Sequence, residues 1–134
     1  MIDFENQIYT KVAQALRTAY GNDFHVQSIT TYSPEVFPLV CVEEADNYAD
    51  AESRDSGSNE VYANIMYEVT VYSNKASKAK SECKAIFQTV DTTLATLGFT
   101  RTVRTTIRMK DAQICRMVGR YEAQINSSGI IFRR

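Results

Sequence analysis

The sequence predicts an α+β fold, a mainly antiparallel β-sheet packed against two helices in the order α-β-β-β-α-β-β-β. Three observations support it: apolar residues recur at helical spacing in two long stretches, they alternate with polar residues in shorter ones, and turn-forming residues lie between. Separate runs of strands and helices are typical of this class. The 134 residues are 44% apolar and 23% charged, which predicts one domain over residues 1–134.

The first expected helix covers residues 3–20. Asp3 is suited to cap its N-terminus, and Gly21-Asn22 is suited to end it. The apolar side chains recur every three or four positions, so they form one stripe that a sheet or another helix must cover. They are Phe4, Ile8, Val12, Leu16 and Ala19.

Two short strands are expected next, over residues 26–32 and 38–43, with a turn at Ser33-Pro34-Glu35. Pro38 cannot donate a hydrogen bond to a neighbouring strand, which suits the start of a strand or the edge of a sheet. The clearest strand is 60–73, where apolar residues alternate with more polar ones.

Residues 45–59 are polar, acidic and aperiodic, which predicts a long acidic loop. The segment 43–60 holds seven acids against one base, Arg54. A loop of this kind either serves binding or is mobile in the isolated protein. The candidate contact acids of this region are Glu43, Glu44, Asp46, Asp50, Glu52 and Asp55.

The second expected helix covers residues 75–97, and Gly98 fits the left-handed position that ends it. Three strands and their turns complete the chain. The strands are expected at 100–109, 116–125 and 130–132, with turns at 110–112 and 126–129.

Nothing in the sequence argues for catalysis, a cofactor or a dedicated metal site. The single histidine, His25, has no second histidine to join it, and no nucleotide-binding, metalloprotease or nucleophile motif occurs. Glu43, Glu44 and Asp46 lack a basic or nucleophilic partner at a defined spacing, so a solvated surface is the favoured interpretation. The acids of the 45–59 loop do not follow the pattern of a calcium-binding loop. We therefore expect a protein that is not an enzyme.

The cysteines, the apolar runs and the N-terminal residues indicate which metal, redox and membrane features to expect. Cys41, Cys83 and Cys115 have no zinc-ligand or redox spacing, which favours three small buried apolar residues. No apolar run reaches the length of a membrane span, and the N-terminal residues do not resemble a secretory signal. We expect no membrane partner.

The charge changes sign along the chain. Residues 99–134 carry eight Lys or Arg against two acids, whereas residues 1–98 carry seven against fourteen. One region is about +6 and the other about −7, although the net charge is only −1. This division favours head-to-tail contact between copies of the chain.

Four arginines of the basic region are candidate interface residues: Arg104, Arg108, Arg116 and Arg120. If 100–109 and 116–125 pair as a hairpin, we expect all four on one face, where they repel one another unless solvated or paired. Three interpretations are open: a solvated face, contact with nucleic acid, and pairing with an acidic surface of another copy. We favour the last for the set, because 45–59 supplies such a surface. A heterologous contact of this kind closes into a ring where the rotation permits.

The end of the chain carries a recognisable pattern. Ile114-Cys-Arg-Met-Val-Gly-Arg-Tyr-Glu-Ala-Gln-Ile125 is followed by Asn-Ser-Ser-Gly-Ile-Ile-Phe-Arg-Arg134. This strand, turn and short arginine-ended strand resemble the end of small tailed-bacteriophage neck proteins, the tail terminator or tail-completion family. The element order of the rest of the chain agrees, while the resemblance in actual residues lies mainly in 114–134.

The resemblance implies a structural virion protein of the tail or neck, assembled in the host cytoplasm. Proteins of this family form a homohexameric ring that caps the polymerised tail tube and joins it to the head-completion or connector protein. DNA passes through the lumen without specific binding. The acidic loop 45–59 would either line that lumen or contact the next ring. In the lumen, an acidic wall would let DNA slide because it repels phosphate. No catalytic residue is implied.

Other functions are open at this point. Within a phage, a head-completion ring or a tail-tube subunit is the nearest alternative. A small metal-dependent enzyme using Glu43, Glu44 and Asp46 predicts turnover that depends on a divalent metal. A nucleic-acid-binding module using the arginine face predicts an affinity for duplex DNA that falls steeply as salt rises.

Overall fold

The computed structural model describes residues 3–49, 62–111, 113–126 and 131–132. Its two helices and its strands follow the expected order, and the α+β class is confirmed. The elements are α1 (Glu5–Tyr20), β1 (His25–Gln27), β2 (Leu39–Ala49), β3 (Tyr62–Ser73), α2 (Ala79–Leu97), β4 (Thr100–Ile107), β5 (Cys115–Asn126) and β6 (Ile131–Phe132).

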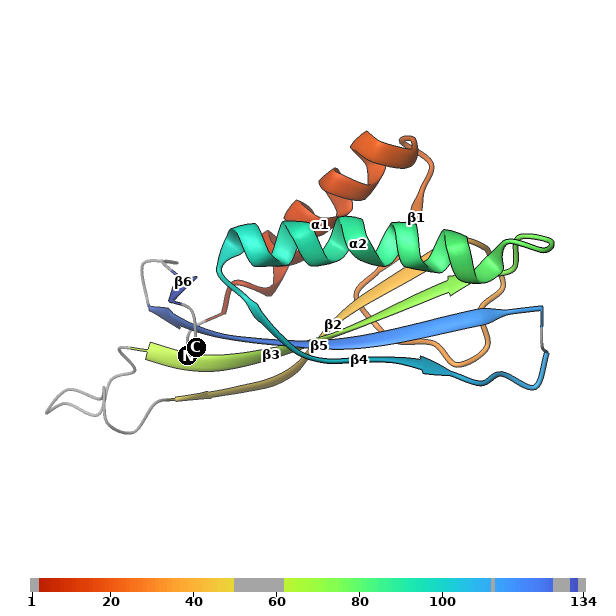
Figure 1. Ribbon diagram of the computed structural model, residues 1–134. Coiled ribbons are helices and arrows are strands. Elements are labelled where there is room, and N and C mark those ends of the chain that lie inside the picture. The colour runs from red at the N-terminus through yellow and green to blue at the C-terminus, as the bar shows by residue number, and fades with distance from the viewer. Residues whose placement is uncertain (1–2, 50–61, 112, 127–130, 133–134) are drawn as a thin grey trace, which may run out of the picture.

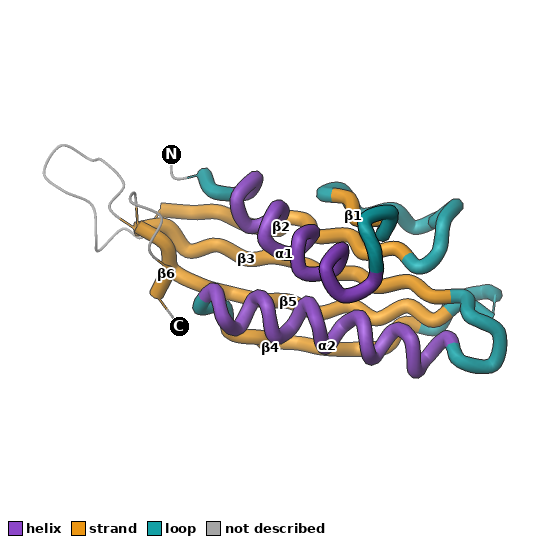
Figure 2. The backbone as a smooth tube through the Cα atoms, turned by 90° about the horizontal axis from the view of Figure 1, so that it is seen from above, coloured by secondary structure: helices purple, strands orange, loops and turns teal. Residues whose placement is uncertain are grey.

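The strands form one sheet in the order β1-β2-β3-β5-β4, and β6 pairs with the end of β5. β1 is parallel to β2, and every other pair among the described strands is antiparallel. Both helices lie on the same face of the sheet, with α1 over the side of β2 and β3 and α2 over the side of β5 and β4 (Figures 1 and 2). We call this covered side the helix face and the opposite side the outer face.

The main core lies between the helices and the helix face. Alternate residues of β3 and β5 point into it and meet the apolar stripes of both helices, as the period of two in the sequence predicts. Full burial of one such aliphatic or aromatic side chain contributes about 1.5–3 kcal/mol. The largest fully buried side chains include Tyr67, Tyr121, Phe87 and Leu16.

Close packing explains the glycine inside β5. A Cβ placed on Gly119 would lie 2.4 Å from Cζ and 2.9 Å from Cε2 of Phe87 in α2. Phe87 is itself buried, so it has little room to move away. The missing side chain therefore lets α2 approach the sheet closely.

Both helices begin later than the sequence suggests. α1 starts at Glu5, with Phe4 rather than Asp3 in the cap position, although Asp3 Oδ1 accepts a hydrogen bond from the Glu5 amide at 3.2 Å. α2 starts at Ala79, because a turn with Ser77 at a φ of 62° precedes it. The expected helix ends are confirmed at Gly21 and at Gly98, which takes the left-handed conformation.

The outer face is partly covered by the loop between β1 and β2. The expected strand 26–32 is confined to His25–Gln27, since the chain then leaves the sheet edge and passes beneath the sheet (Figure 1). Tyr72 Oη donates a hydrogen bond to the Thr31 carbonyl at 2.6 Å and holds the loop there. A second, smaller core of Leu39, Cys41 and Tyr72 forms beneath it. Pro38 directly precedes β2, as expected of a strand start.

β2 corrects the expected boundary of the acidic loop. It runs to Ala49, so residues 45–49 form strand rather than loop, while residues 50–59 lie outside the described part of the chain. Ala45 is an extra residue in a β-bulge, because Glu44 lies opposite Tyr67 and Asp46 lies opposite Met66. The bulge explains why simple alternation does not reveal the strand.

Candidate interaction surface

The register of β4 and β5 determines which candidate arginines lie together, because residues directly opposite on antiparallel strands share a face. Arg104 lies opposite Gly119, on the helix face, whereas Arg116 and Arg120 belong to the outer face. Arg108 lies beyond the end of β4 and is exposed. The prediction that all four arginines share one face is therefore wrong. Arg104 is paired with Gly119, which lies on the helix face beneath Phe87 of α2, and this register separates Arg104 from Arg116 and Arg120.

Arg116 holds the loop between β1 and β2. Its guanidinium carbon lies 5.1 Å from the ring centroid of Tyr32 and 5.7 Å from that of Tyr72. Such cation–π contacts favour Arg because its flat, weakly hydrated group stacks on aromatic rings. Among the described residues, Arg116 Nε is buried without a hydrogen-bond partner. Its position indicates a role inside the protomer.

Arg120 already has an acidic neighbour within the chain. It lies opposite Glu68 on the outer face, and its Nε is 3.5 Å from Glu68 Oε2. The Arg120 side chain is 53% exposed, so water screens this ion pair and it contributes little to stability. Arg120 remains accessible to a partner.

The bulge of β2 separates the candidate acids between the two faces. Glu43 lies opposite Glu68 on the outer face and accepts a hydrogen bond from Thr30 Oγ1 at 3.0 Å. Asp46 is exposed on the same face. Glu44 instead lies on the helix face. The other three candidates, Asp50, Glu52 and Asp55, lie outside the described residues.

Glu44 belongs to an acidic cluster at the N-terminus of α1. Burial raises the pKa of the Glu44 carboxyl, and the negative charges of Glu5 and Asp3 raise it further. A hydrogen bond from Asn47 Nδ2 at 3.3 Å opposes this rise. Three like charges thus converge where one of them is already poorly solvated.

The hydroxyl of Tyr67 lies beside this cluster. Tyr67 is directly opposite Glu44, is fully buried, and its Oη lacks a hydrogen-bond partner among the described residues. Burial raises the pKa of Tyr67 far above its ordinary value, and the charges of Glu44, Glu5 and Asp3 add to the rise. We call Asp3, Glu5, Glu44 and Tyr67 the acidic corner. A buried polar atom without a hydrogen-bond partner costs free energy. The Tyr67 hydroxyl therefore destabilises the acidic corner in the isolated protomer.

The basic counterpart is at the other edge of the sheet. Arg101 in β4 makes an ion pair with Asp91 of α2, with Nη1 3.1 Å from Oδ1, and Tyr121 Oη donates a hydrogen bond to the same carboxylate at 2.8 Å. Arg101 is 45% exposed. Sequence analysis did not single it out, because a bulge at Thr102 turns it toward the helix face. The ten-residue separation of Asp91 and Arg101 across a helix end gave no signal.

Glu44 and Arg101 stand at the two ends of one row of residues. Glu44 lies opposite Tyr67, Tyr67 lies opposite Tyr121, and Tyr121 lies opposite Arg101. All four are therefore on the helix face, and the row crosses the four strands β2, β3, β5 and β4, which lie side by side in this order (Figure 2). The helix face therefore carries Glu44 at its β2 edge and Arg101 at its β4 edge.

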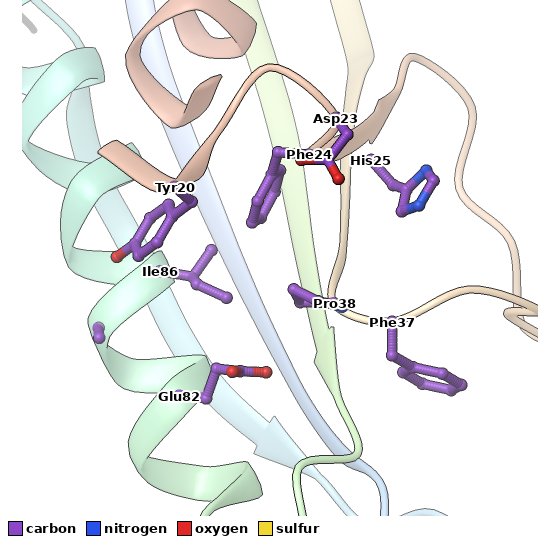
Figure 3. Close-up of a pocket in the computed structure, with 9 residues that line it drawn as sticks. Tyr20, Asp23, Phe24, His25, Phe37, Pro38, Glu82 and Ile86 are labelled. Carbon is purple, nitrogen blue, oxygen red and sulfur yellow. The ribbon is translucent and has the colours of Figure 1, made fainter. Parts of the chain in front are cut away.

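A pocket of about 310 Å³ lies between α2, the end of α1 and the start of β2 (Figure 3). Its walls are largely apolar, and Glu82 and His25 come from opposite sides of it. Glu82 is engaged with the hydroxyl of Ser73 and lies 3.9 Å from Lys75 Nζ. The arrangement gives His25 and Glu82 no common reacting point, so it does not support acid–base catalysis.

Two features of the described residues concern metal binding and membrane spanning. Within the described ranges, His, Cys, Asp and Glu residues nowhere gather in threes so as to hold a metal ion. Neither α1 nor α2 combines the length and the apolar character needed to cross a membrane. Cys41 and Cys83 are buried and Cys115 is half-buried, and all three are free thiols.

The loop between β1 and β2 exposes large apolar side chains. Ile29 is 69% exposed, Tyr32 is 70% exposed, and Val36 is also exposed. The loop is held by Tyr72 and Arg116, so these side chains are presented from an anchored segment. Exposed apolar groups gathered in one segment are typical of a protein-binding surface.

Comparison with known proteins identifies a similar fold. Neither a known protein family nor a curated protein matches the sequence. Among solved structures, a chain described as "Virion of native gene transfer agent (GTA) particle" is similar, with a TM-score of 0.64 and 14% sequence identity. The match covers 92% of this chain and 94% of that chain. At this identity the likeness shows a shared fold.

Proposed function

We propose that this protein is a structural component of a tailed-phage virion, a tail terminator whose copies form a ring. The observation that carries the proposal is the agreement in fold with a virion chain over nearly the full length of both chains. The resemblance of residues 114–134 to tail terminator proteins supports the finer assignment. The protein has no catalytic role in this proposal.

The distribution of charge supports assembly as the mechanism. Acidic residues gather at the β2 edge and Arg101 and Arg104 lie at the β4 edge, so one copy offers each of its neighbours a different, complementary surface. A heterologous contact between such surfaces produces a ring when the rotation closes, and an open filament when it does not. We expect six copies, as the resemblance implies.

The ring would cap the tail tube and join it to the head-completion or connector protein. DNA would pass through the lumen without specific binding, which fits a chain whose net charge is −1. The anchored loop with Ile29, Tyr32 and Val36 supplies apolar contacts for one of these neighbouring virion proteins.

Binding to tail tubes tests this function. The purified protein is added to cognate tail tubes that lack a terminator, tube subunits are then supplied, and the particles are imaged by negative-stain electron microscopy. We expect a ring at one end of each tube and no further growth from that end. Incorporation along a growing tube would indicate a tube subunit instead, and failure to associate would contradict the proposal.

A further inference from the structure

The acidic edge of the sheet is open over part of β2. β1 pairs only with Leu39–Cys41, so from residue 42 onward β2 has a strand neighbour on one side only, within the described residues. Glu44 lies in this open part and belongs to the acidic corner. The corner contains three carboxylates and the unpartnered hydroxyl of the buried Tyr67, but no cation of the described residues lies within ion-pair distance of those carboxylates.

The basic edge is open along β4. β4 is the last strand of the sheet, and its residues 101–106 are exposed. Arg104 makes no ion pair with a described carboxylate, and the ion pair of Arg101 uses only one side of its guanidinium. Between them Val103 is 46% exposed, an apolar β-branched residue that suits a covered strand better than an edge. An exposed edge strand is a template for pairing with another chain.

The direction of the strands allows the two edges to join. β2 is antiparallel to β3, β3 to β5, and β5 to β4, so three reversals leave β4 antiparallel to β2. A second copy advanced sideways across the sheet therefore presents its β2 antiparallel to β4, with the helices of both copies on the same side. If the pairing of residues continues across this interface without a change of register, Arg101 of one copy lies opposite Glu44 of the next copy.

Arg104 reaches the same carboxylate from the neighbouring row. Its row runs through Gly119 and Val69 to Val42, two positions from Glu44. Diagonal positions on paired strands lie about 7–8 Å apart, within reach of a long side chain. Both arginines and the acidic corner are on the helix face. The pairing therefore makes the helix face of one copy continuous with that of the next.

We propose that residues 101–104 of one copy add to residues 42–44 of a second copy as a short antiparallel strand pair that ends where β1 begins, and that Arg101 and Arg104 fill the acidic corner. The partner is a second copy of this chain, chosen by charge complementarity between its two open edges. The site is incomplete in one protomer, because the cation comes from the neighbour. This inference rests on the proposed ring, for which it supplies the interface.

A guanidinium fits the corner better than a metal ion does. The carboxylates of Asp3, Glu5 and Glu44 do not converge closely enough to hold a metal ion together. A guanidinium carries its donors in a broad planar fork, which serves several separated carboxylate oxygens.

Charge reversal in pairs tests this interface. The double substitution Arg101→Glu/Arg104→Glu reverses the charge of one edge and Glu44→Arg reverses the charge of the other, while Lys84→Glu, at an exposed position of α2, is the matched control. Particle mass is measured by light scattering, and the fold of each variant is checked by circular dichroism. We expect no rings from either edge variant alone and normal rings from the control.

An equal mixture of the two edge variants is the decisive sample. Each then supplies the surface that the other needs, so rings of alternating copies should form, and the chain that carries all three substitutions should also form rings. Rings from the Arg101→Glu/Arg104→Glu variant alone, or no rings from folded variants in the mixture, would overturn the strand pairing while leaving the ring function intact. Absence of rings from the native chain, with or without tail tubes, would instead reject the proposed function.

Discussion

The two open edges of the sheet differ in how their charges are held. At the β2 edge, Glu44 is partly buried against the N-terminus of α1, where like charges and burial raise its pKa. At the β4 edge, Arg101 and Arg104 are exposed, and Asp91 and Tyr121 support only the first. The β2 edge therefore carries closely spaced acidic groups, whereas the β4 edge carries exposed arginines. In the proposed ring, the charges of each edge would be balanced by the neighbouring copy rather than within one protomer.

The largest expected effect on the fold comes from a substitution that disturbs both edges together. Gly119→Ala places a Cβ against the buried Phe87, and overpacking of this kind costs about 1–3 kcal/mol of the free energy of unfolding. Because Gly119 lies in the row that joins Val42 at the β2 edge to Arg104 at the β4 edge, ring formation should fall with stability. Thermal unfolding followed by circular dichroism measures the change. Thr105→Val, at an exposed position of β4, is the control and should change the melting temperature little.

The two buried tyrosines in the row between Glu44 and Arg101 provide a second test of the difference between the edges. Tyr121 donates a hydrogen bond to Asp91, whereas the Tyr67 hydroxyl lacks a partner in the protomer. Tyr121→Phe should therefore lower the free energy of unfolding by about 1 kcal/mol, the usual net contribution of an intramolecular hydrogen bond. Tyr67→Phe should leave the free protomer as stable as before or more so. Equal losses in chemical denaturation would show that the two hydroxyls are equally satisfied.

A smaller effect of opposite sign is expected at the acidic edge. The raised pKa of Glu44 means that its ionisation opposes folding: the stabilisation is present below its ordinary pKa and is lost as pH rises through the raised value. Glu44→Gln should thus increase the melting temperature of the free protomer at neutral pH and have little effect in acid. The same variant should form rings less well. A variant that is both less stable and unaltered in assembly would contradict this account.

The sequence predicted the class and order of the elements but not the positions of the charged groups. Alternation in 60–73 and the stop at Gly98 are local signals, and both appear in the structure. The faces of Arg101 and Asp46 depend on single extra residues, Thr102 and Ala45, which shift the alternation without a recognisable signature. The placement of Arg104 away from Arg116 and Arg120 depends on strand register.

The order of the strands in the sheet is the second feature that the sequence did not reveal. β5 lies between β3 and β4 in the sheet, so β4 becomes the edge although it precedes β5 in the chain. The open edges follow from this order. The acidic corner also requires α1 to cross the far end of β2, because Asp3 and Glu5 are distant from Glu44 in sequence.

The mass of the native protein at low and high salt tests the central claim most directly. Light scattering and negative-stain images of one sample should show a closed ring near the mass of a hexamer at low salt. Ion pairs between copies weaken as the Debye length falls from about 10 Å at 0.1 M to about 3 Å at 1 M salt, so the ring should dissociate at high salt. A ring that is indifferent to salt would contradict closure through the charged edges. A monomer under all conditions, also in the presence of tail tubes, would contradict the ring itself.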